Sequence, residues 1–237
     1  KGSLFASVVR VFSMKVHKAM NVYKGVDAFI TPSEFLKKKL IENGFDENKI
    51  TCIPTFTASK SEVGKPQVGT YGLYFGRVTE EKGVDTVVKA YEMMPDRHVK
   101  IMGDDTTDEA KRLKAYIKEK NIQNVEFFGF KAGEELEEII KGARFTLIPS
   151  IWYDNLPNTA LESFQYSKPV IASNIGSLPE LVLDGVNGYL FKPADALELC
   201  EKVALLDDDA VVEKMGAASR ARLEDRFAPQ THYNTLM

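Results

Sequence analysis

Two cationic side chains occupy a place in the sequence where a phosphorylated ligand could bind. Arg77 and Lys82 lie between an apolar run that predicts a buried strand and a stretch whose apolar residues recur at helical spacing. A guanidinium offers a planar fork of donors and an ammonium a point charge, so the pair suits a di- or triphosphate beside a helix N-terminus. The segment contains neither a GxxxxGK(S/T) phosphate loop nor a GxGxxG dinucleotide turn. Taken alone, two such cations are equally typical of a solvent-exposed surface.

Two carboxylates follow in the second half of the chain. Asp154 lies in a polar and aromatic loop at residues 151–156, and Glu162 lies a turn and a half into the helix predicted to follow it. Carboxylates repel phosphate, but an ionised carboxylate accepts hydrogen bonds from two neighbouring hydroxyl groups of a sugar. Glu162 alone is equally typical of a helix surface. Together with the two cations, the two acids favour a nucleotide-sugar site.

The elements that must position these residues alternate between strand and helix. Apolar runs predict strands at 68–75, 99–102, 125–128, 144–149, 169–172 and 188–191. Helices are predicted at 84–94, 108–120, 134–141, 194–206 and 209–226, with another that opens at Pro157 and a short element at 178–183. This alternation implies right-handed crossovers and an α/β, Rossmann-like, doubly wound parallel sheet. Its ligands bind beyond the C-terminal ends of the strands, where residues 76–83, 129–131 and 151–156 lie.

Composition divides the chain into three parts. Residues 1–55 show helix, strand, helix and strand, which cannot bury a core alone, so we interpret them as the remnant of a preceding N-terminal domain. Thr, Ser, Lys, Gly and Pro dominate residues 56–67, as in an interdomain linker. Residues 68–237 then form the ligand-binding domain.

Charge and hydropathy narrow the classes of partner. A net charge of −3 argues against a nucleic-acid binder, which normally shows a basic face. No apolar run reaches the roughly 18–20 residues that span a bilayer, and no signal peptide is recognisable, so a cytoplasmic protein is expected. Residues 1–25 predict a basic amphipathic helix. Such a helix could contact an anionic membrane surface or an acceptor phosphate, or it could pack on a partner domain with its charges in water.

The sequence offers little support for a metal site. Asp104 and Asp105 form a tight acidic turn, which is more typical of helix capping than of metal binding. Cys52 and Cys200 lie far apart without CxxC or Cys/His spacing, so buried free thiols in a reducing compartment are expected. We therefore expect neither a metal nor another cofactor.

Several motifs, taken together, resemble the donor-binding half of the retaining GT-B glycosyltransferases of group 1, also called family 4. The resemblance covers nearly all of residues 68–226. The matching residues are Gly76-Arg77 with Glu81-Lys82-Gly83, Phe128-Gly129, Pro149-Ser150 with Asp154 and Glu162, Lys168-Pro169-Val170-Ile171-Ala172, and Gly185-Val186-Asn187-Gly188. The segment 28–54, with Thr31-Pro32-Ser33-Glu34-Phe35, resembles the end of that family's acceptor-side domain.

The resemblance implies a role for each candidate residue. Arg77 and Lys82 would hold the donor diphosphate, Glu162 the nucleotide ribose, and Asp154 the donor sugar. Backbone groups would complete the site: those of Asn155, Leu156, Pro157, Asn158 and Thr159 for sugar and phosphate, those of Gly129, Phe130 and Lys131 for the base, and Gly76 for close approach. Most of the family carries Glu where this chain has Asp154, and a glycine where it has Asp105.

The resemblance also implies a reaction. A sugar would pass from a UDP-sugar or GDP-sugar to an acceptor hydroxyl, with retained anomeric configuration and no metal ion. A saccharide or lipid-linked acceptor, as in cell-surface polysaccharide assembly at the inner face of the membrane, would bind to the N-terminal domain. Because most of that domain is absent, the chain alone would bind donor but turn over poorly. The alternatives are a nucleotide-sugar epimerase or phosphorylase on the same fold, or a domain that binds nucleotide sugars without catalysis.

Overall fold

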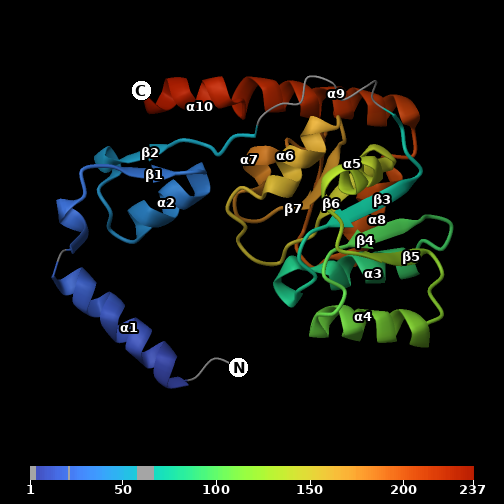
Figure 1. The fold of residues 1–237 in the computed structure, drawn as a ribbon, viewed down its shortest axis with the longest axis horizontal. Helices are drawn as coiled ribbons and strands as arrows, with labels where there is room; N and C mark the ends of the chain where they lie inside the picture. The colour runs from blue at the N-terminus through green and yellow to red at the C-terminus, as the bar shows by residue number, and fades with distance from the viewer. Residues whose placement is uncertain (1–3, 21, 58–66) are drawn as a thin grey trace.

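The computed structural model describes residues 4–20, 22–57 and 67–237, which form two parallel sheets and the helices around them (Figure 1). A two-stranded sheet pairs β1 (Phe29–Thr31) with β2 (Ile50–Cys52), and α2 (Glu34–Glu42) connects the two strands. The helix α1 (Leu4–Ala19) and two short 3-10 segments, η1 (Val22–Gly25) and η2 (Glu47–Lys49), complete this part. The predicted order of helix, strand, helix and strand is confirmed, whereas most of the predicted linker lies outside the described residues.

The main sheet has six parallel strands in the order β5-β4-β3-β6-β7-β8. Their bounds are β3 (Tyr71–Phe75), β4 (Val99–Met102), β5 (Val125–Gly129), β6 (Ala143–Ile148), β7 (Val170–Ser173) and β8 (Gly188–Phe191). The chain begins at the centre with β3, runs outward to β5 and then crosses back to β6 on the other side of β3. The strand order therefore reverses between β3 and β6, which is where doubly wound sheets bind ligands. The predicted α/β, doubly wound, parallel architecture is confirmed.

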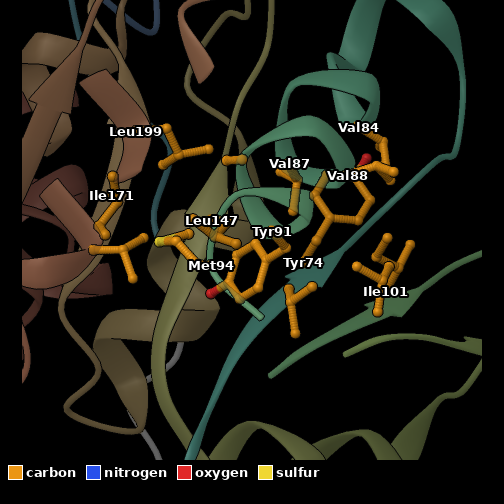
Figure 2. Close-up of a cluster of buried hydrophobic side chains, with 14 of the residues drawn as sticks. Tyr74, Val84, Val87, Val88, Tyr91, Met94, Ile101, Leu147, Ile171 and Leu199 are labelled. Carbon is orange, nitrogen blue, oxygen red and sulfur yellow. The ribbon is translucent and has the colours of Figure 1, made fainter. Parts of the chain in front are cut away.

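Helices cover both faces of the main sheet, because successive strand residues point to opposite faces. On β3, Tyr74 points into the core cluster under α3 (Val84–Glu92), while Leu73 points into the cluster under α5 (Gly133–Lys141). Figure 2 shows the first cluster, in which Tyr74 and Leu147 meet the apolar face of α3 and Leu199 of α8 (Ala196–Ala204). The other helical segments are η3 (Glu80–Lys82), α4 (Asp108–Glu119), α6 (Asn158–Gln165), α7 (Leu178–Leu181) and α9 (Asp209–Arg226).

The final helix, α10 (Pro229–Leu236), is a finding that the sequence pattern does not predict. It has no fully buried residue among its eight positions, so it lacks the apolar stripe by which a helix is recognised. Its His232 lies against the N-terminal part: a ring nitrogen is 2.7 Å from the carbonyl oxygen of Pro54, and the ring centroid is 4.7 Å from that of Phe56. The end of the chain thus returns to the segment that follows β2. None of the described helices is both long enough and apolar enough to cross a bilayer.

A buried ammonium group, that of Lys168, forms hydrogen bonds with three segments at the amino-terminal edge of the main sheet. Lys168 is only 2% exposed, and its Nζ donates to the carbonyl oxygens of Gln67, Lys141 and Ala143 at 2.6–2.7 Å. Burial lowers the pKa of Lys168 to about 8, while three carbonyl acceptors favour the charged form. This one side chain therefore links the segment that leads into β3, the end of α5 and the start of β6.

We expect Lys168→Met to lower the free energy of unfolding by about 2–4 kcal/mol, because buried carbonyl groups would lose their donor. Denaturant unfolding followed by circular dichroism measures the change. Lys141→Met is the matched control, since the Lys141 side chain pairs with Glu138 at the surface and its carbonyl oxygen is unaffected. Equal unfolding midpoints for the two variants would contradict a structural role for the Lys168 ammonium.

Candidate functional site

A pocket of about 260 Å³ opens between the C-terminal ends of β3 and β6, where the strand order reverses. Several of the predicted site residues line it. The loop after β3 contributes Gly76, Arg77 and Lys82, and the region after β6 contributes Asp154, Asn155, Pro157, Asn158 and Thr159. Residues separated by more than 70 positions in the sequence thus share one pocket because their strands are neighbours in a parallel sheet.

The two loops can meet because the chain packs closely at Gly83. Gly83 has a φ of +68°, and a Cβ atom at this position would lie 2.0 Å from the carbonyl oxygen of Pro149. Only glycine satisfies both the left-handed backbone and the contact. Beside it, the Ile151 N–H donates to the carbonyl oxygen of Glu81 at 3.0 Å. The loop after β3 is therefore fixed directly against the loop after β6.

Lys82 and Asp154 form an ion pair across the pocket. The Lys82 ammonium contacts one carboxylate oxygen of Asp154, and the hydroxyl of Ser150 donates to the other. The side chains of Lys82 and Asp154 are only 19% and 14% exposed. A pair withdrawn from water to this extent is screened less than a surface pair, so the contact orders both side chains.

Arg77 differs sharply from Lys82 in its surroundings. Its side chain is 72% exposed, and its guanidinium lies 3.7 Å from the Glu81 carboxylate, a surface contact of little energetic weight. The Arg77 carbonyl oxygen, in contrast, accepts a hydrogen bond from the buried Tyr74 hydroxyl. Burial raises the pKa of Tyr74, so the phenol stays protonated as a donor. The backbone at Arg77 is thus fixed while its cationic end is exposed at the pocket.

The N-terminus of α6 forms a further wall of the pocket. The helix begins at Asn158, directly after Pro157, and within the described part of the chain no side chain caps it. Asn158 and Thr159 both line the pocket. The first N–H groups of a helix have no intrahelical acceptor and carry partial positive charge, so they suit an anion.

Leu156 has a structural position in the loop before α6. Its side chain is buried in the core cluster that contains Leu161 and Phe164, and its φ is +55°. Its N–H donates to the Ser177 hydroxyl at 2.8 Å, and that hydroxyl donates to the carbonyl oxygen of Asp154 at 2.7 Å. The Leu156 amide is therefore used inside the protein. Ser177 is the residue that sequence reasoning missed, and only its place in a small-residue turn after a strand hinted at it.

Glu162 lies outside the pocket lining, farther along α6. It is partly buried, and this burial raises the pKa of its carboxyl group. A partly desolvated carboxylate on the helix that forms the pocket wall can accept hydrogen bonds from a ligand that extends beyond the pocket.

The three residues predicted for base binding lie at the end of β5, two strands away from β3. Gly129 has a φ of +69°, and its carbonyl oxygen accepts from the Gly103 N–H at 3.0 Å. The Phe130 side chain is 75% exposed, and the Lys131 ammonium pairs with Glu135 at 2.6 Å. This group is therefore at the same edge of the sheet as the pocket but does not line it.

The acidic turn after β4 has the contacts of a solvated turn. Asp104 accepts from the Thr106 N–H at 2.9 Å, and Asp105 pairs with Lys114 at 2.5 Å. Among the residues that the structure describes, no group of three or more His, Cys, Asp or Glu side chains could hold a metal ion. Cys52 and Cys200 are both free thiols, but each is only partly buried, so the prediction that they are buried is wrong.

Comparisons with known proteins place this geometry in a family. Residues 56–222 match the family model for glycosyl transferases group 1. An uncharacterised glycosyltransferase of Methanocaldococcus jannaschii is 30% identical over 193 residues, which are 80% of this chain and 54% of that protein. A glycogen synthase of Mycobacterium tuberculosis is 29% identical over 197 residues, which are 81% and 45% of the two chains. The chain thus spans about half the length of these curated relatives.

Solved structures agree on the fold. A glycosyltransferase from Rickettsia africae has a TM-score of 0.79 at 21% identity, with 89% of this chain and 62% of that chain covered. Anabaena HepE, solved in complex with UDP and glucose, has a TM-score of 0.78 at 20% identity with the same coverage. The family match over most of the chain and the doubly wound sheet lead to one conclusion. The chain belongs to the glycosyltransferases of group 1 and has the fold of a GT-B glycosyltransferase.

Proposed function

We propose that this chain is the donor-binding part of a retaining glycosyltransferase that transfers a hexose from a nucleoside-diphosphate sugar to an acceptor hydroxyl. The observation that carries the proposal is the pocket between β3 and β6, where Arg77, Lys82 and the N-terminus of α6 converge. The complex of Anabaena HepE with UDP and glucose supports a nucleotide-sugar donor for this chain.

The pocket supplies what a departing diphosphate needs. As the bond between sugar and diphosphate breaks, negative charge develops on the leaving phosphate oxygens. Lys82 and the first N–H groups of α6 are a charge and dipoles held in place by the fold, and such preorganised groups stabilise developing charge more effectively than water does. The exposed Arg77 guanidinium is free to swing onto a bound diphosphate, since its surface contact with Glu81 is weak.

The carboxylates would recognise the sugar groups of the donor. Asp154 neutralises Lys82 in the ligand-free protein, so a diphosphate on Lys82 would release carboxylate oxygens of Asp154 toward the hydroxyls of the transferred sugar. Glu162 would accept from the ribose hydroxyls, and Gly129, Phe130 and Lys131 would contact the base.

The acceptor belongs to the N-terminal side of the proposed enzyme. We expect a saccharide or a lipid-linked saccharide at the inner face of the membrane, and the isolated chain to turn over poorly. Phe5 and Phe12 of α1 are exposed beside Arg10 and Lys15, so α1 suits either of the two roles open to it: an anionic membrane surface or a partner domain.

Binding of nucleoside diphosphates tests the proposal. We expect UDP or GDP to bind the unaltered chain, and Arg77→Ala with Lys82→Ala to weaken binding at least about 100-fold, because two charge-assisted contacts to phosphate would be lost. Isothermal calorimetry measures the affinity. A thermal-shift panel of UDP- and GDP-sugars then identifies the donor, since a ligand of the native state raises apparent stability.

Lys111→Ala is the matched control for these variants, because Lys111 is an exposed lysine on α4 whose ammonium lies 3.9 Å from Asp108. It should leave nucleotide affinity unchanged. No binding of any nucleoside diphosphate or its sugar to the unaltered chain would sink the proposal, as would equal affinities for the double variant and the control.

Asp154→Asn separates phosphate binding from sugar recognition. We expect this variant to bind UDP or GDP about three- to tenfold more tightly, because the diphosphate no longer competes with a carboxylate for Lys82. At the same time, the difference in affinity between the nucleotide sugar and the plain nucleoside diphosphate should become smaller. Calorimetry with both ligands measures the two effects, and weaker binding of the plain diphosphate would show that Asp154 does not compete for Lys82.

A further inference from the structure

We infer that Glu180 is a positioning residue that couples occupancy of the donor pocket to the docking of α2. The inference rests on the proposed function, because it takes the pocket between β3 and β6 as the nucleotide site. Glu180 lies on α7 beside the main sheet, whereas α2 belongs to the separate two-stranded sheet. The two elements are 145 positions apart in the sequence.

The contact is a helix cap supplied from a distant part of the chain. One carboxylate oxygen of Glu180 accepts from the Glu34 N–H at 2.8 Å, and the other accepts from the Phe35 N–H at 2.7 Å. Glu34 and Phe35 are the first two residues of α2, so their N–H groups have no acceptor within the helix. A carboxylate at a helix N-terminus gains both hydrogen bonds and a favourable interaction with the helix dipole.

A second contact connects the same helix end to the pocket. The buried Ser33 hydroxyl caps α2 by accepting from the Leu36 N–H at 3.1 Å, and it donates to Oδ1 of Asn155 at 2.9 Å. Asn155 lines the pocket. Next to it, the Tyr153 ring lies 5.0 Å from the Phe35 ring, centroid to centroid. The N-terminus of α2 therefore lies against the loop that precedes α6.

The segment around Glu180 is held in place by buried neighbours, so it can transmit a change from the loop that precedes α6. Leu178 and Leu181, on either side of it, are fully buried, and Arg222 of α9 donates to the Leu181 carbonyl oxygen at 2.9 Å. Three residues before Glu180, the Ser177 hydroxyl bonds both Asp154 and Leu156 of the pocket loop. One short segment thus fixes the pocket loop through Ser177 and α2 through Glu180.

The consequence is a reciprocal coupling between two places. A ligand that orders Asn155 and the backbone of Asp154 also favours the arrangement in which Ser177 and Glu180 meet their partners, so α2 docks more firmly. By linkage, firm docking of α2 must raise the affinity of the pocket by the same factor. Glu180 does not line the pocket, so this effect is one of position and not of direct ligand contact.

Amide hydrogen exchange at Glu34 and Phe35, measured by NMR, tests the coupling. In the unaltered chain, saturating UDP or GDP should slow exchange at these two amides by about threefold or more, although neither lies in the pocket. In Glu180→Gln only one oxygen can accept, so exchange in the ligand-free chain should become about five- to tenfold faster. In this variant the nucleotide should no longer slow exchange at Glu34 and Phe35. The affinity of the variant for the nucleotide should fall by the same factor by which the nucleotide slows exchange in the unaltered chain.

Three further variants sharpen the result. Glu198→Gln is the matched control, because the Glu198 carboxylate also accepts from a backbone N–H, that of Lys192 at 2.8 Å, within the main domain. It should change neither exchange at α2 nor nucleotide affinity. Glu180→Asp keeps the charge and should restore part of the coupling. If Glu180→Gln fails to fold, Ser33→Ala tests the same link from the side of α2 and should also reduce the effect of nucleotide.

The outcomes separate this inference from the proposed function. Nucleotide binding without any change of exchange at Glu34 and Phe35 would overturn the role of Glu180 and leave the proposed function standing. The same holds if Glu180→Gln speeds exchange but keeps the full effect of nucleotide, since Glu180 would then be a cap and nothing more. Absence of nucleotide binding in the unaltered chain would overturn both.

Discussion

The ion pair of Lys82 with Asp154 is the interaction on which the geometry of the pocket depends. It spans the point where the sheet reverses its strand order, and it joins the loops after β3 and β6. Burying two charges costs desolvation energy, which close contact and the additional donor Ser150 offset only in part. The pair therefore orders the side chains of the pocket while adding little to the stability of the fold. A diphosphate that replaces Asp154 as the partner of Lys82 meets a site that is already desolvated.

The sequence predicts most of the fold because each element shows its own local signal. The bounds of β4 and β8 are predicted to the residue, since each is a short, mostly apolar run that ends at a glycine or a charged residue. The helix α2 has such signals at both ends, because the Ser33 hydroxyl caps its first turn and Gly44, with a φ of +88°, follows its last. The first strand of the main sheet, β3, begins at Tyr71 and not at residue 68 as predicted, because Val68 packs on the core without joining the sheet. The helix α10 could not be predicted, since no apolar periodicity distinguishes it.

The candidate site is predictable in part for the same reason. Arg77, Lys82 and Asp154 follow strands, and the topology of a parallel sheet brings strand ends to one edge, so residue type and position suffice to place them in one pocket. The hydrogen-bond partners of these residues could not be predicted. Lys82, and not Arg77, contacts Asp154, while Ser177 holds the pocket loop and Glu180 holds α2. All of these are polar contacts between segments that are distant in the sequence. Such contacts leave no period or spacing in the sequence.

Among the described residues, contacts of different chemistry connect the N-terminal part to the elements of the main sheet. Near the C-terminal end, α10 meets Pro54 and Phe56 through His232, whereas beside the pocket Glu180 and Asn155 meet the start of α2. The first contact lies away from the pocket, whereas the second lies against the pocket loop. In the proposed enzyme this difference makes α2, not α10, the element that responds to donor binding.

The most direct test of the central claim is an NMR titration of the chain with UDP and GDP. If the pocket between β3 and β6 holds the diphosphate, the largest amide shifts should fall on Gly76, Lys82, Asn158 and Thr159. Amides of α4, which lies away from the pocket, should stay unchanged. Shifts centred on another face of the sheet, or none at saturating nucleotide, would contradict the account.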